Sequence, residues 1–401
     1  MKNTKKFFLA LGLITLTLAL LAANSVHAIE VTATVPVGSS PMAAVYDSGK
    51  GEVFVANSGS NSISVISDAN DSVVATIPLP SGSLNPNDLA YDPNKGEILV
   101  LNNPGGVLSI FSHLSSTISM ISDTTDTIVT TITLGFNNVV GICYDSNKGD
   151  IVVTSQNPGG PVSFISDTSD GVVSTVLVGG HPQGIVYDSG MGETFVSTEG
   201  DTNSWISVIP DNSNTVVANV TVQNVPLGLA YDFGKGEIFA ASVPTPELNQ
   251  LINPEVGVYV ISDQTDSVVT SVPMPTGTVR LAYDSEQGEI FVTYAGDSNI
   301  VSVISDRSNS VVANVTVANT QLQGLCYDSA KSEIFVTNPS NATVTVISDS
   351  SVPAANATPT TVPSSPSVPE LSFQVLLIAM VATGIITAAF CSLKKTNNRL
   401  F

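Results

Sequence analysis

The residues in this sequence that could bind a cation are carboxylates spaced three positions apart in Asp- and Asn-rich turns. They occur as Asp68-x-Asn70-Asp71, Asp123-x-x-Asp126, Asp167-x-x-Asp170, Asp263-x-x-Asp266 and Asp306-x-x-Asn309. Ca²⁺ takes about six to eight oxygen ligands, and no turn has the dense Asp-x-Asp-x-Asp-Gly run that supplies them. The spacing therefore predicts hairpin turns, with weak binding of divalent cations over an acidic face and no defined metal site.

The histidines and cysteines do not form a pattern typical of a catalytic centre. His27 falls in the N-terminal leader, and His113 and His181 belong to different copies of an internal repeat. A zinc or copper site needs three or more clustered ligands. Cys143 and Cys326 occupy equivalent positions in copies that are not neighbours, so no disulfide is expected. No Ser/His/Asp order and no glycine-rich phosphate loop is present, so we expect no catalytic residue, no cofactor and no enzyme activity.

A Tyr-Asp pair marks the internal repeat. Its tyrosines are Tyr46, Tyr91, Tyr144, Tyr187, Tyr231, Tyr283 and Tyr327, spaced by 45, 53, 43, 44, 52 and 44 residues. Each copy holds four short runs rich in Val, Ile and Thr, which in the first copy are PMAAVYD (41–47), GEVFVAN (51–57), SISVISD (62–68) and SVVATIP (72–78). Four short strands per unit of this length are typical of a propeller blade. The sequence therefore predicts an all-β fold, a seven-bladed β-propeller of four-stranded antiparallel blades over residues 29–349.

The last copy lacks its fourth run, because the chain passes from Asp349 directly into a proline-rich segment. The segment IEVTATVPVG (29–38) matches the fourth-run pattern and precedes every first run. We therefore expect this N-terminal strand to complete the last blade. Closing the ring in this way removes two open sheet edges, which would otherwise promote aggregation.

The residues that recur in every copy are expected to be structural. Each tyrosine of the Tyr-Asp pairs should pack between blades, and each aspartate should bind backbone N–H groups of the turn that follows. The aromatic residues Phe54, Phe195, Phe239, Phe291 and Phe335 are expected in the core. The residues expected to line the central axis are small or apolar, which disfavours an enzyme; they are Ala44, Ala90, Ile142, Ile185, Leu229, Leu281 and Leu325.

The two ends of the chain predict export and anchoring. Residues 1–28 have the lysines, the apolar run and the small-x-small site of a cleaved signal peptide. Residues 350–370 form a Pro/Ser/Thr-rich stalk, and the uncharged residues 371–393 are long enough to span a bilayer as a helix. The basic tail 394–401 then predicts a cytoplasmic C-terminus, with the propeller on the extracellular face of the cell membrane.

The charge of the chain is strongly segregated. All 34 acidic residues lie between Glu30 and Glu370, whereas six of the 13 basic residues lie in the two ends. An acidic body of this kind repels phosphate backbones, so binding of nucleic acid is not expected. It favours basic partners, cations and solubility outside the cell.

Two insertions distinguish the copies from one another. The segments NPGGVLSIFSHLSS (103–116) and VPTPELNQLINPE (243–255) lie between second and third strands, where other copies have short loops. Alternate loops of an up-and-down blade lie on opposite faces, so both insertions should face away from the stalk. Irregular loops on a rigid scaffold often carry binding sites, and we expect protein or glycan partners to bind here, although surface insertions without a partner are also tolerated.

Five Asn-x-Ser/Thr sequons predict glycosylation of an exported chain. They begin at Asn70, Asn219, Asn314, Asn341 and Asn356. In the two predicted outer strands, Asn219 alternates with Val220 and Asn314 with Val315, so each asparagine should face solvent.

The strings VFVANSGSNSISVISDANDSVVATIP (53–78) and IFVTNPSNATVTVISD (334–349) resemble the YVTN-type propeller repeat, and the resemblance extends over 29–349. That family includes archaeal surface-layer and cell-surface proteins, and its relatives range from propellers proposed to bind single-stranded DNA to lactonase-like enzymes. The resemblance therefore implies the fold but not one function. The segment Val368-Pro369-Glu370-Leu371 resembles a Pro-Glu-Phe sorting signal with Leu in place of Phe, so both retention and processing of the C-terminal helix are open.

Taken together, these features predict a non-catalytic, membrane-anchored extracellular propeller that serves as a surface-layer, envelope or adhesion and interaction protein. One alternative is a propeller that binds a soluble glycan, peptide or metal in its central channel. The other is a lactonase-like or other hydrolase of the same fold, which would draw polar catalytic residues from several first strands.

Overall fold

A computed structural model describes residues 26–81, 83–104, 115–213, 215–244, 257–275, 277–318 and 320–352. The predicted membrane segment 371–393, the basic tail 394–401, the stalk beyond residue 352 and the leader up to residue 25 lie outside these residues. In the part of the chain that is described, no helix has the length and apolar character needed to cross a membrane.

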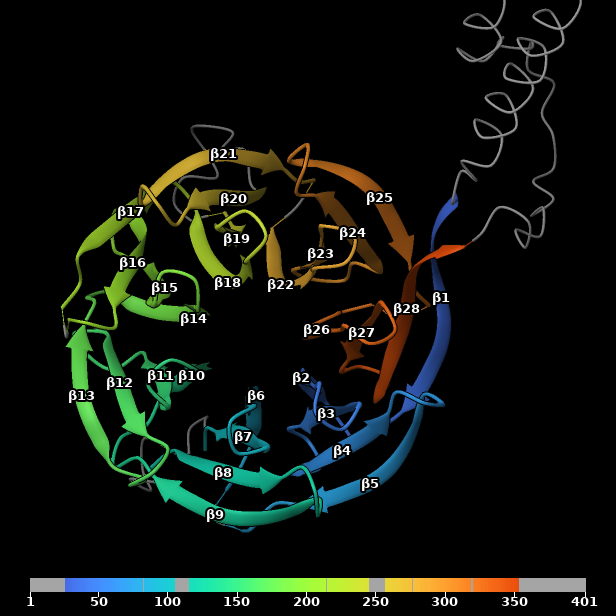
Figure 1. The fold of residues 1–401 in the computed structure, drawn as a ribbon, viewed down its shortest axis with the longest axis horizontal. Coiled ribbons are helices and arrows are strands. Elements are labelled where there is room, and N and C mark those ends of the chain that lie inside the picture. The colour runs from blue at the N-terminus through green and yellow to red at the C-terminus, as the bar shows by residue number, and fades with distance from the viewer. Residues whose placement is uncertain are drawn as a thin grey trace, which may run out of the picture. The chain divides into compact units, whose positions relative to one another are not determined.

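The described residues form seven four-stranded antiparallel sheets arranged in a ring (Figure 1). Blades 1 to 3 are β2 (Pro41–Asp47), β3 (Glu52–Asn57), β4 (Ser62–Ser67) and β5 (Ser72–Pro78); β6 (Pro86–Asp92), β7 (Glu97–Asn102), β8 (Thr117–Ser122) and β9 (Thr127–Thr133); and β10 (Val139–Asp145), β11 (Asp150–Ser155), β12 (Pro161–Ser166) and β13 (Val172–Leu177). Blades 4 and 5 are β14 (His181–Asp188), β15 (Glu193–Glu199), β16 (Ser204–Pro210) and β17 (Ala218–Val222); and β18 (Val225–Asp232), β19 (Glu237–Val243), β20 (Gly257–Ser262) and β21 (Ser267–Pro273). Blades 6 and 7 are β22 (Thr278–Asp284), β23 (Glu289–Tyr294), β24 (Ile300–Ser305) and β25 (Ser310–Thr316); and β26 (Leu325–Asp328), β27 (Glu333–Asn338), β28 (Thr343–Val352) and β1 (Val26–Pro36). The predicted seven-bladed propeller is confirmed.

The core lies between the blades. Seven hydrophobic clusters each join residues of two adjacent blades, as when Leu99 of β7 packs in one cluster with Val153 of β11. The second and third strands of each blade are covered on both faces, and every residue of β3 is buried. This explains why these runs are nearly continuous in Val, Ile and Phe. The five second-strand phenylalanines, from Phe54 to Phe335, are fully buried.

The N-terminal strand closes the ring, as predicted. β1 is the outermost strand of blade 7 and pairs antiparallel with β28, from Pro36 opposite Thr343 to Val26 opposite Val352. The pairing extends three residues beyond the predicted boundaries at each end, because residues 26–28 of the predicted leader pair with residues 350–352 of the predicted stalk. The first and last strands of the propeller are therefore joined by backbone hydrogen bonds.

The outermost strands carry a shared irregularity. In five of them one valine is an extra residue opposite the third strand, and these bulged valines are 51–57% exposed: Val74, Val129, Val173, Val269 and Val312. A bulge bends and twists the strand that contains it. Because these strands form the rim of the ring, the bulges make their free edges poor templates for pairing with another chain.

One inner strand is shorter than predicted. The segment LQGLCYD (322–328) is equivalent to the first run PMAAVYD (41–47), which predicts a strand of the same length, but β26 begins at Leu325. The N–H of Gly324 donates to Thr337 Oγ1 of β27 at 2.8 Å and to the carbonyl of Met42 in blade 1 at 3.1 Å. The bond to Met42 crosses the junction between the last and first blades, so the start of this run contacts both its own sheet and blade 1.

Deleting residues 29–36 should open the ring, because it removes the outer strand of blade 7 and leaves β28 as a free edge. We expect a fall in melting temperature of roughly 10 °C or more together with aggregation, measured by calorimetry and light scattering. A control deletion of residues 356–363, outside the propeller, should leave the melting temperature unchanged. A closure deletion that melts within a couple of degrees of the full chain would contradict the role given to β1.

Candidate functional site

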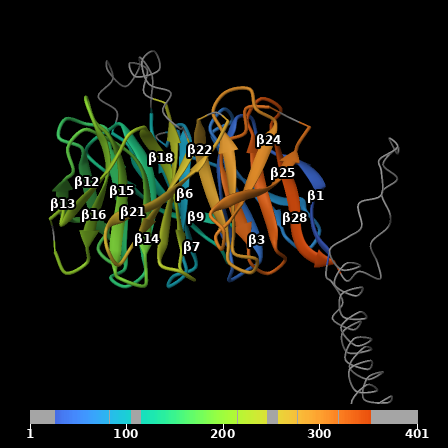
Figure 2. The same cartoon turned by 90° about the horizontal axis from the view of Figure 1, so that it is seen from above.

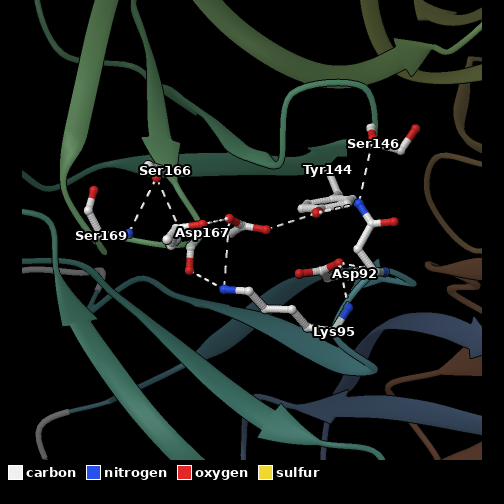
Figure 3. A network of polar contacts seen from close by, with 9 residues as sticks. Asp92, Lys95, Tyr144, Ser146, Ser166, Asp167 and Ser169 are labelled. Carbon is white, nitrogen blue, oxygen red and sulfur yellow. Dashed lines mark hydrogen bonds and ion pairs between the residues drawn. The ribbon is translucent and has the colours of Figure 1, made fainter.

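The most regular polar arrangement lies at the face of the propeller where first strands turn into second strands. At the junction of blades 2 and 3, Asp92 Oδ1 accepts hydrogen bonds from the backbone N–H groups of Asn94 (2.9 Å) and Lys95 (3.2 Å). The hydroxyl of Tyr144 donates to Asp167 Oδ2 at 2.9 Å and accepts from Asn94 Nδ2 at 3.0 Å (Figure 3). Lys95 Nζ reaches from blade 2 to the backbone carbonyl of Asp167 in blade 3. Asn94 and Lys95 of blade 2 thus reach Tyr144 and Asp167 of blade 3.

The same arrangement recurs around the ring. The seven first-strand aspartates are completely buried; they are Asp47, Asp92, Asp145, Asp188, Asp232, Asp284 and Asp328. Tyr187 donates to Asp211 at 2.8 Å, and Tyr46 to Asp68 at 3.4 Å. Burial, followed by neighbouring carboxylates, raises the pKa of each of these tyrosines, so they remain neutral donors. The hydrogen bonds of Tyr187 and Tyr46 lie within single blades, whereas six of the seven tyrosines pack in the clusters that join adjacent blades, as predicted.

The local sequence fixes the turn that carries this network. Gly96 follows Lys95 with φ of 65°, a backbone conformation that side chains disfavour. A Cβ at Gly96 would also lie 2.4 Å from a carboxylate oxygen of Asp123. Glycine is therefore required both by the conformation and by the space. The turns between third and fourth strands place Asp71, Asp126, Asp170, Asp266 and Asn309 at φ between 48° and 56°, so these residues serve the hairpins.

The turn face is rich in carboxylates, and lysines neutralise most of its junctions. Lys50 Nζ of blade 1 lies 3.0 Å from Glu52 and 2.9 Å from Asp126 in blade 2. Lys95 and Lys235 reach the next blade in the same way. Blade 4 has Met191 at this position and blade 6 has Gln287, so two junctions lack the cation.

Burial and mutual repulsion raise the pKa of carboxylates at the turn face. Burial, followed by repulsion from Asp266, Asp188 and other aspartates, raises the pKa of Glu193 to about 7 beside Met191. Burial, followed by the neighbouring Asp284 and Glu289, raises the pKa of Asp349 to about 9. Over the described ranges, no three His, Cys, Asp or Glu side chains are grouped so that they could hold a metal ion. Weak binding of divalent cations over the acidic face stays a prediction.

The opposite face carries the variable connections. The insertion 103–116 begins after β7, where Asn102 is buried and its amide donates to Thr117 Oγ1 (3.2 Å) and Ser119 Oγ (3.1 Å) of β8. The insertion 243–255 leaves from the end of β19, where Ser242 Oγ donates to the carbonyl of Gly257 at 2.7 Å. Residues 105–114 and 245–255 lie outside the described residues. The strand ends from which the two insertions leave are therefore fixed by hydrogen bonds.

A cavity of about 500 Å³ lies on blade 6, beside the loop that joins β23 and β24. It is lined by Pro275, Tyr294, Ala295, Asp297, Ser298, Ile300 and Asn314. The cavity is mainly apolar, and the hydroxyl of Tyr294 is paired with Ser302 Oγ. It holds no arrangement of an acid, a base and a nucleophile.

The predicted residues of the central axis are in the wrong place. Ala90, Ile142, Leu281 and Leu325 are at most 9% exposed, and Ala44, Ile185 and Leu229 pack against the same interblade clusters. The preceding position of the strand lies where neighbouring inner strands meet: a Cβ at Gly184 would lie 2.3 Å from the carbonyl oxygen of Leu227 in the next blade. Alternation along a strand reverses the side-chain direction at each residue. The sequence prediction missed this position because it selected residues one place too far along the strand, or two places in the case of Ala90.

The remaining candidates are dispersed. Cys143 and Cys326 are free, and burial raises the pKa of both thiols, so neither is an activated nucleophile. His181 is exposed at the start of β14, and His113 lies outside the described residues. The described sequon residues Asn70, Asn219, Asn314 and Asn341 are all exposed, and Asn356 lies outside the described part.

Comparison with known proteins supports the fold alone. No protein-family model matches the sequence, and no curated protein matches it. Among solved structures 1683 chains match, which marks a widespread architecture. One is Kuenenia stuttgartiensis hydrazine synthase, with 13% identity and a TM-score of 0.65, over 78% of this chain and 96% of that one. Another is the WD40 beta-propeller domain of Doa1, with 14% identity and a TM-score of 0.60, over 80% and 97% respectively.

The raised pKa of Glu193 predicts that the propeller is more stable in mild acid. The folded chain binds this proton up to about pH 7, whereas the ordinary pKa is 4.5. The folded state therefore holds more protons between these values, and its stability falls as the pH rises through that window. Thermal melts at pH 5 and pH 8 should show the higher melting temperature at pH 5.

Replacing Met191 by lysine should restore the missing cation at the junction of blades 4 and 5. Met191→Lys should raise the melting temperature at pH 8 by a few degrees and change it little at pH 5. The matched control is Met191→Gln, which copies the neutral residue of blade 6 and should have no pH-dependent effect. Equal stabilisation by lysine at both pH values would contradict the electrostatic cause.

Proposed function

We propose that this chain is an exported, membrane-anchored propeller that binds partners with the face turned away from its anchor. In this proposal the protein belongs to the cell-surface or surface-layer class that its YVTN-type repeats resemble. It acts as an envelope or adhesion protein and not as an enzyme. Residues 371–393 would supply the anchor, and residues 350–370 the stalk.

The observation that carries this proposal is the direction in which the last strand leaves the ring. β28 ends at Val352 on the face that carries the turns between first and second strands (Figure 2). Strands of an up-and-down blade alternate in direction, so the connections between second and third strands lie on the other face. Both insertions belong to these connections. An anchor that follows β28 would therefore leave the insertions pointing outward.

The two faces also differ in what they can offer a partner. The turn face is built from repeated Tyr–Asp contacts within blades and Lys–Asp contacts between blades, so these side chains are already engaged. The connections of the other face differ between blades in length and sequence. Variable loops on a rigid scaffold are a common way to bind a partner.

The structural neighbours do not exclude the alternative functions, an enzyme or a ligand-binding propeller. Hydrazine synthase is an enzyme by its name, so the fold is compatible with catalysis, and a WD40 domain is a propeller of another kind. At 13% and 14% identity, neither likeness transfers a function. We prefer the non-catalytic role because the recurring titratable residues are used in contacts between the blades.

The orientation can be tested with epitope tags on intact cells. Tags inserted within 105–114 or within 245–255 should bind antibody readily, because they would lie on the outward face. Matched tags after Ala69 or Gln264, which are exposed on the turn face, should bind several-fold less antibody. Flow cytometry provides the measurement, and detergent-treated cells provide the control in which all four tags are accessible. Equal accessibility on intact cells would refute the orientation.

Partner binding can be tested on the same cells. Replacing both insertions with the short loop NSGSN (57–61) should leave the melting temperature unchanged and abolish adhesion or partner binding. Unchanged adhesion by a correctly displayed variant would show that the insertions are not the binding face.

Glycosylation provides a further test of export. Asn219 Oδ1 accepts from Ser207 Oγ at 2.8 Å, and Asn314 Oδ1 accepts from Ser302 Oγ. These bonds orient the side chains and leave the amide nitrogens, to which a glycan would be joined, for modification. Mass spectrometry of protein from its native host should find glycans on Asn219 and Asn314. Finding all five sequons unmodified would oppose this prediction.

A further inference from the structure

Two inner-strand residues break the pattern of the central axis. The position at which neighbouring inner strands meet is occupied by small residues in five blades: Ala43, Gly141, Gly184, Gly228 and Gly324. In blade 2 the same position holds Asp88, and in blade 6 it holds Arg280. β6 and β22 lie on opposite sides of the axis (Figure 1). One carboxylate and one guanidinium group are therefore placed on opposite sides of the axis, at a position where the remaining blades have small residues.

The position lies near the mouth of the axis on the face with the insertions. Asp88 is two residues from the start of β6, and Arg280 is two residues from the start of β22. At about 3.3 Å per residue, each lies roughly 7 Å along its strand from the strand's start at this face. Both side chains are partly exposed although their strands are innermost in their sheets. Their exposed atoms therefore face the axis or its mouth.

Asp88 is held in place by the backbone. Its Oδ2 accepts from the N–H of Ile142 in blade 3 at 3.1 Å, and its Oδ1 accepts from the N–H of Leu89 at 3.1 Å. Burial raises the pKa of Asp88, and the positive charge of Arg280 opposes that rise. The two charges therefore act on each other across the axis.

Arg280 is positioned by packing against the inner strand of blade 5. Its Cδ lies 3.4 Å from the point where a Cβ would stand on Gly228, so its stem passes over that glycine. Within the described part of the chain, its guanidinium makes no hydrogen bond and no ion pair within 4.0 Å. The other basic residues of the propeller are on the turn face; they are Lys50, Lys95, Lys148, Lys235, Lys331 and Arg307. Arg280 is thus the single cation of the described axis.

We propose that Arg280 and Asp88 form a binding site for a small zwitterion, an amino acid or short peptide, at the mouth of the axis. The planar guanidinium would hold the carboxylate through two parallel hydrogen bonds. Asp88, fixed by two backbone donors, would accept the ammonium group. This site goes beyond the proposed surface function and does not depend on it.

The charge of the protein favours a zwitterion over a simple ion. The chain has a formal net charge of −21, so a simple anion is repelled over the whole approach to the axis. A simple cation is attracted to the mouth but then meets Arg280. A net-neutral ligand with both charges avoids both penalties, and it satisfies Arg280 and Asp88 together.

The site can be tested by titrating the full chain with ω-amino acids of increasing length, from glycine through 4-aminobutanoate to 6-aminohexanoate. Binding is measured by calorimetry, with acetate, butanoate, hexanoate and inorganic phosphate as matched simple anions. We expect one chain length to bind at least about ten-fold more tightly than the simple carboxylate of the same length. Failure of every zwitterion to bind at about 10 mM, or equal binding of phosphate, would overturn the proposal.

Substitutions test whether Arg280 and Asp88 bind the zwitterion. Arg280→Gln should weaken the best zwitterion by at least about ten-fold, and Arg280→Lys should recover only part of the affinity because it lacks the planar fork. Asp88→Asn should lower the affinity for the zwitterion to that for the simple carboxylate of the same length. The matched control is Arg307→Gln, which removes an equal charge from the opposite face and should leave affinity unchanged. If Arg280→Gln melts early, Arg280→Lys and Asp88→Asn carry the test, and unchanged affinity in both would overturn the assignment.

Discussion

The antiparallel pairing of β1 with β28 is the constraint on which the rest of this structure depends. Without it the seven blades would form an open array with two unpaired edges. With it, the first residues of the propeller are hydrogen-bonded to the last, from Pro36 opposite Thr343 to Val26 opposite Val352. The closure also determines where the chain leaves the ring. Because the last blade takes its fourth strand from the N-terminus, the chain departs after a third strand and on the turn face.

A closed ring requires seven compatible junctions, and the buried polar network at the turn face supplies them. Each first-strand aspartate caps its own turn, and a tyrosine hydroxyl lies between carboxylates at the boundary with the next blade. The arrangement concentrates carboxylates, and lysines such as Lys50 offset them by reaching across the junction. Where Met191 replaces the lysine, burial and the neighbouring aspartates raise the pKa of Glu193 to about 7. Contacts between the blades and pH response therefore have one physical origin.

The same repetition shows where function could enter. Positions that must satisfy a requirement common to all blades are uniform, as the Tyr-Asp pairs are. Positions free of that requirement vary, and the variation falls on the insertions at one face and on Asp88 and Arg280 at the axis. Glycine at the meeting point of inner strands lets the backbones approach closely. A Cβ at Gly184 would lie only 2.3 Å from the carbonyl oxygen of Leu227. A charged residue at this point therefore departs from the shared packing and marks a candidate site.

The sequence by itself determined the blades, their number and the closing strand, because the period of Tyr-Asp pairs and the alternation of apolar residues are local patterns. It also assigned the tyrosines and phenylalanines to packing, since a residue present in every blade must serve every blade. Only the tertiary structure decided which side of an inner strand faces the axis. Residues such as Ile142 and Leu281 pack between blades, and the position before them faces the neighbouring strand. The placement of Asp88 opposite Arg280, 192 residues apart in sequence, likewise arises only when the ring closes and sets blades 2 and 6 on opposite sides of the axis.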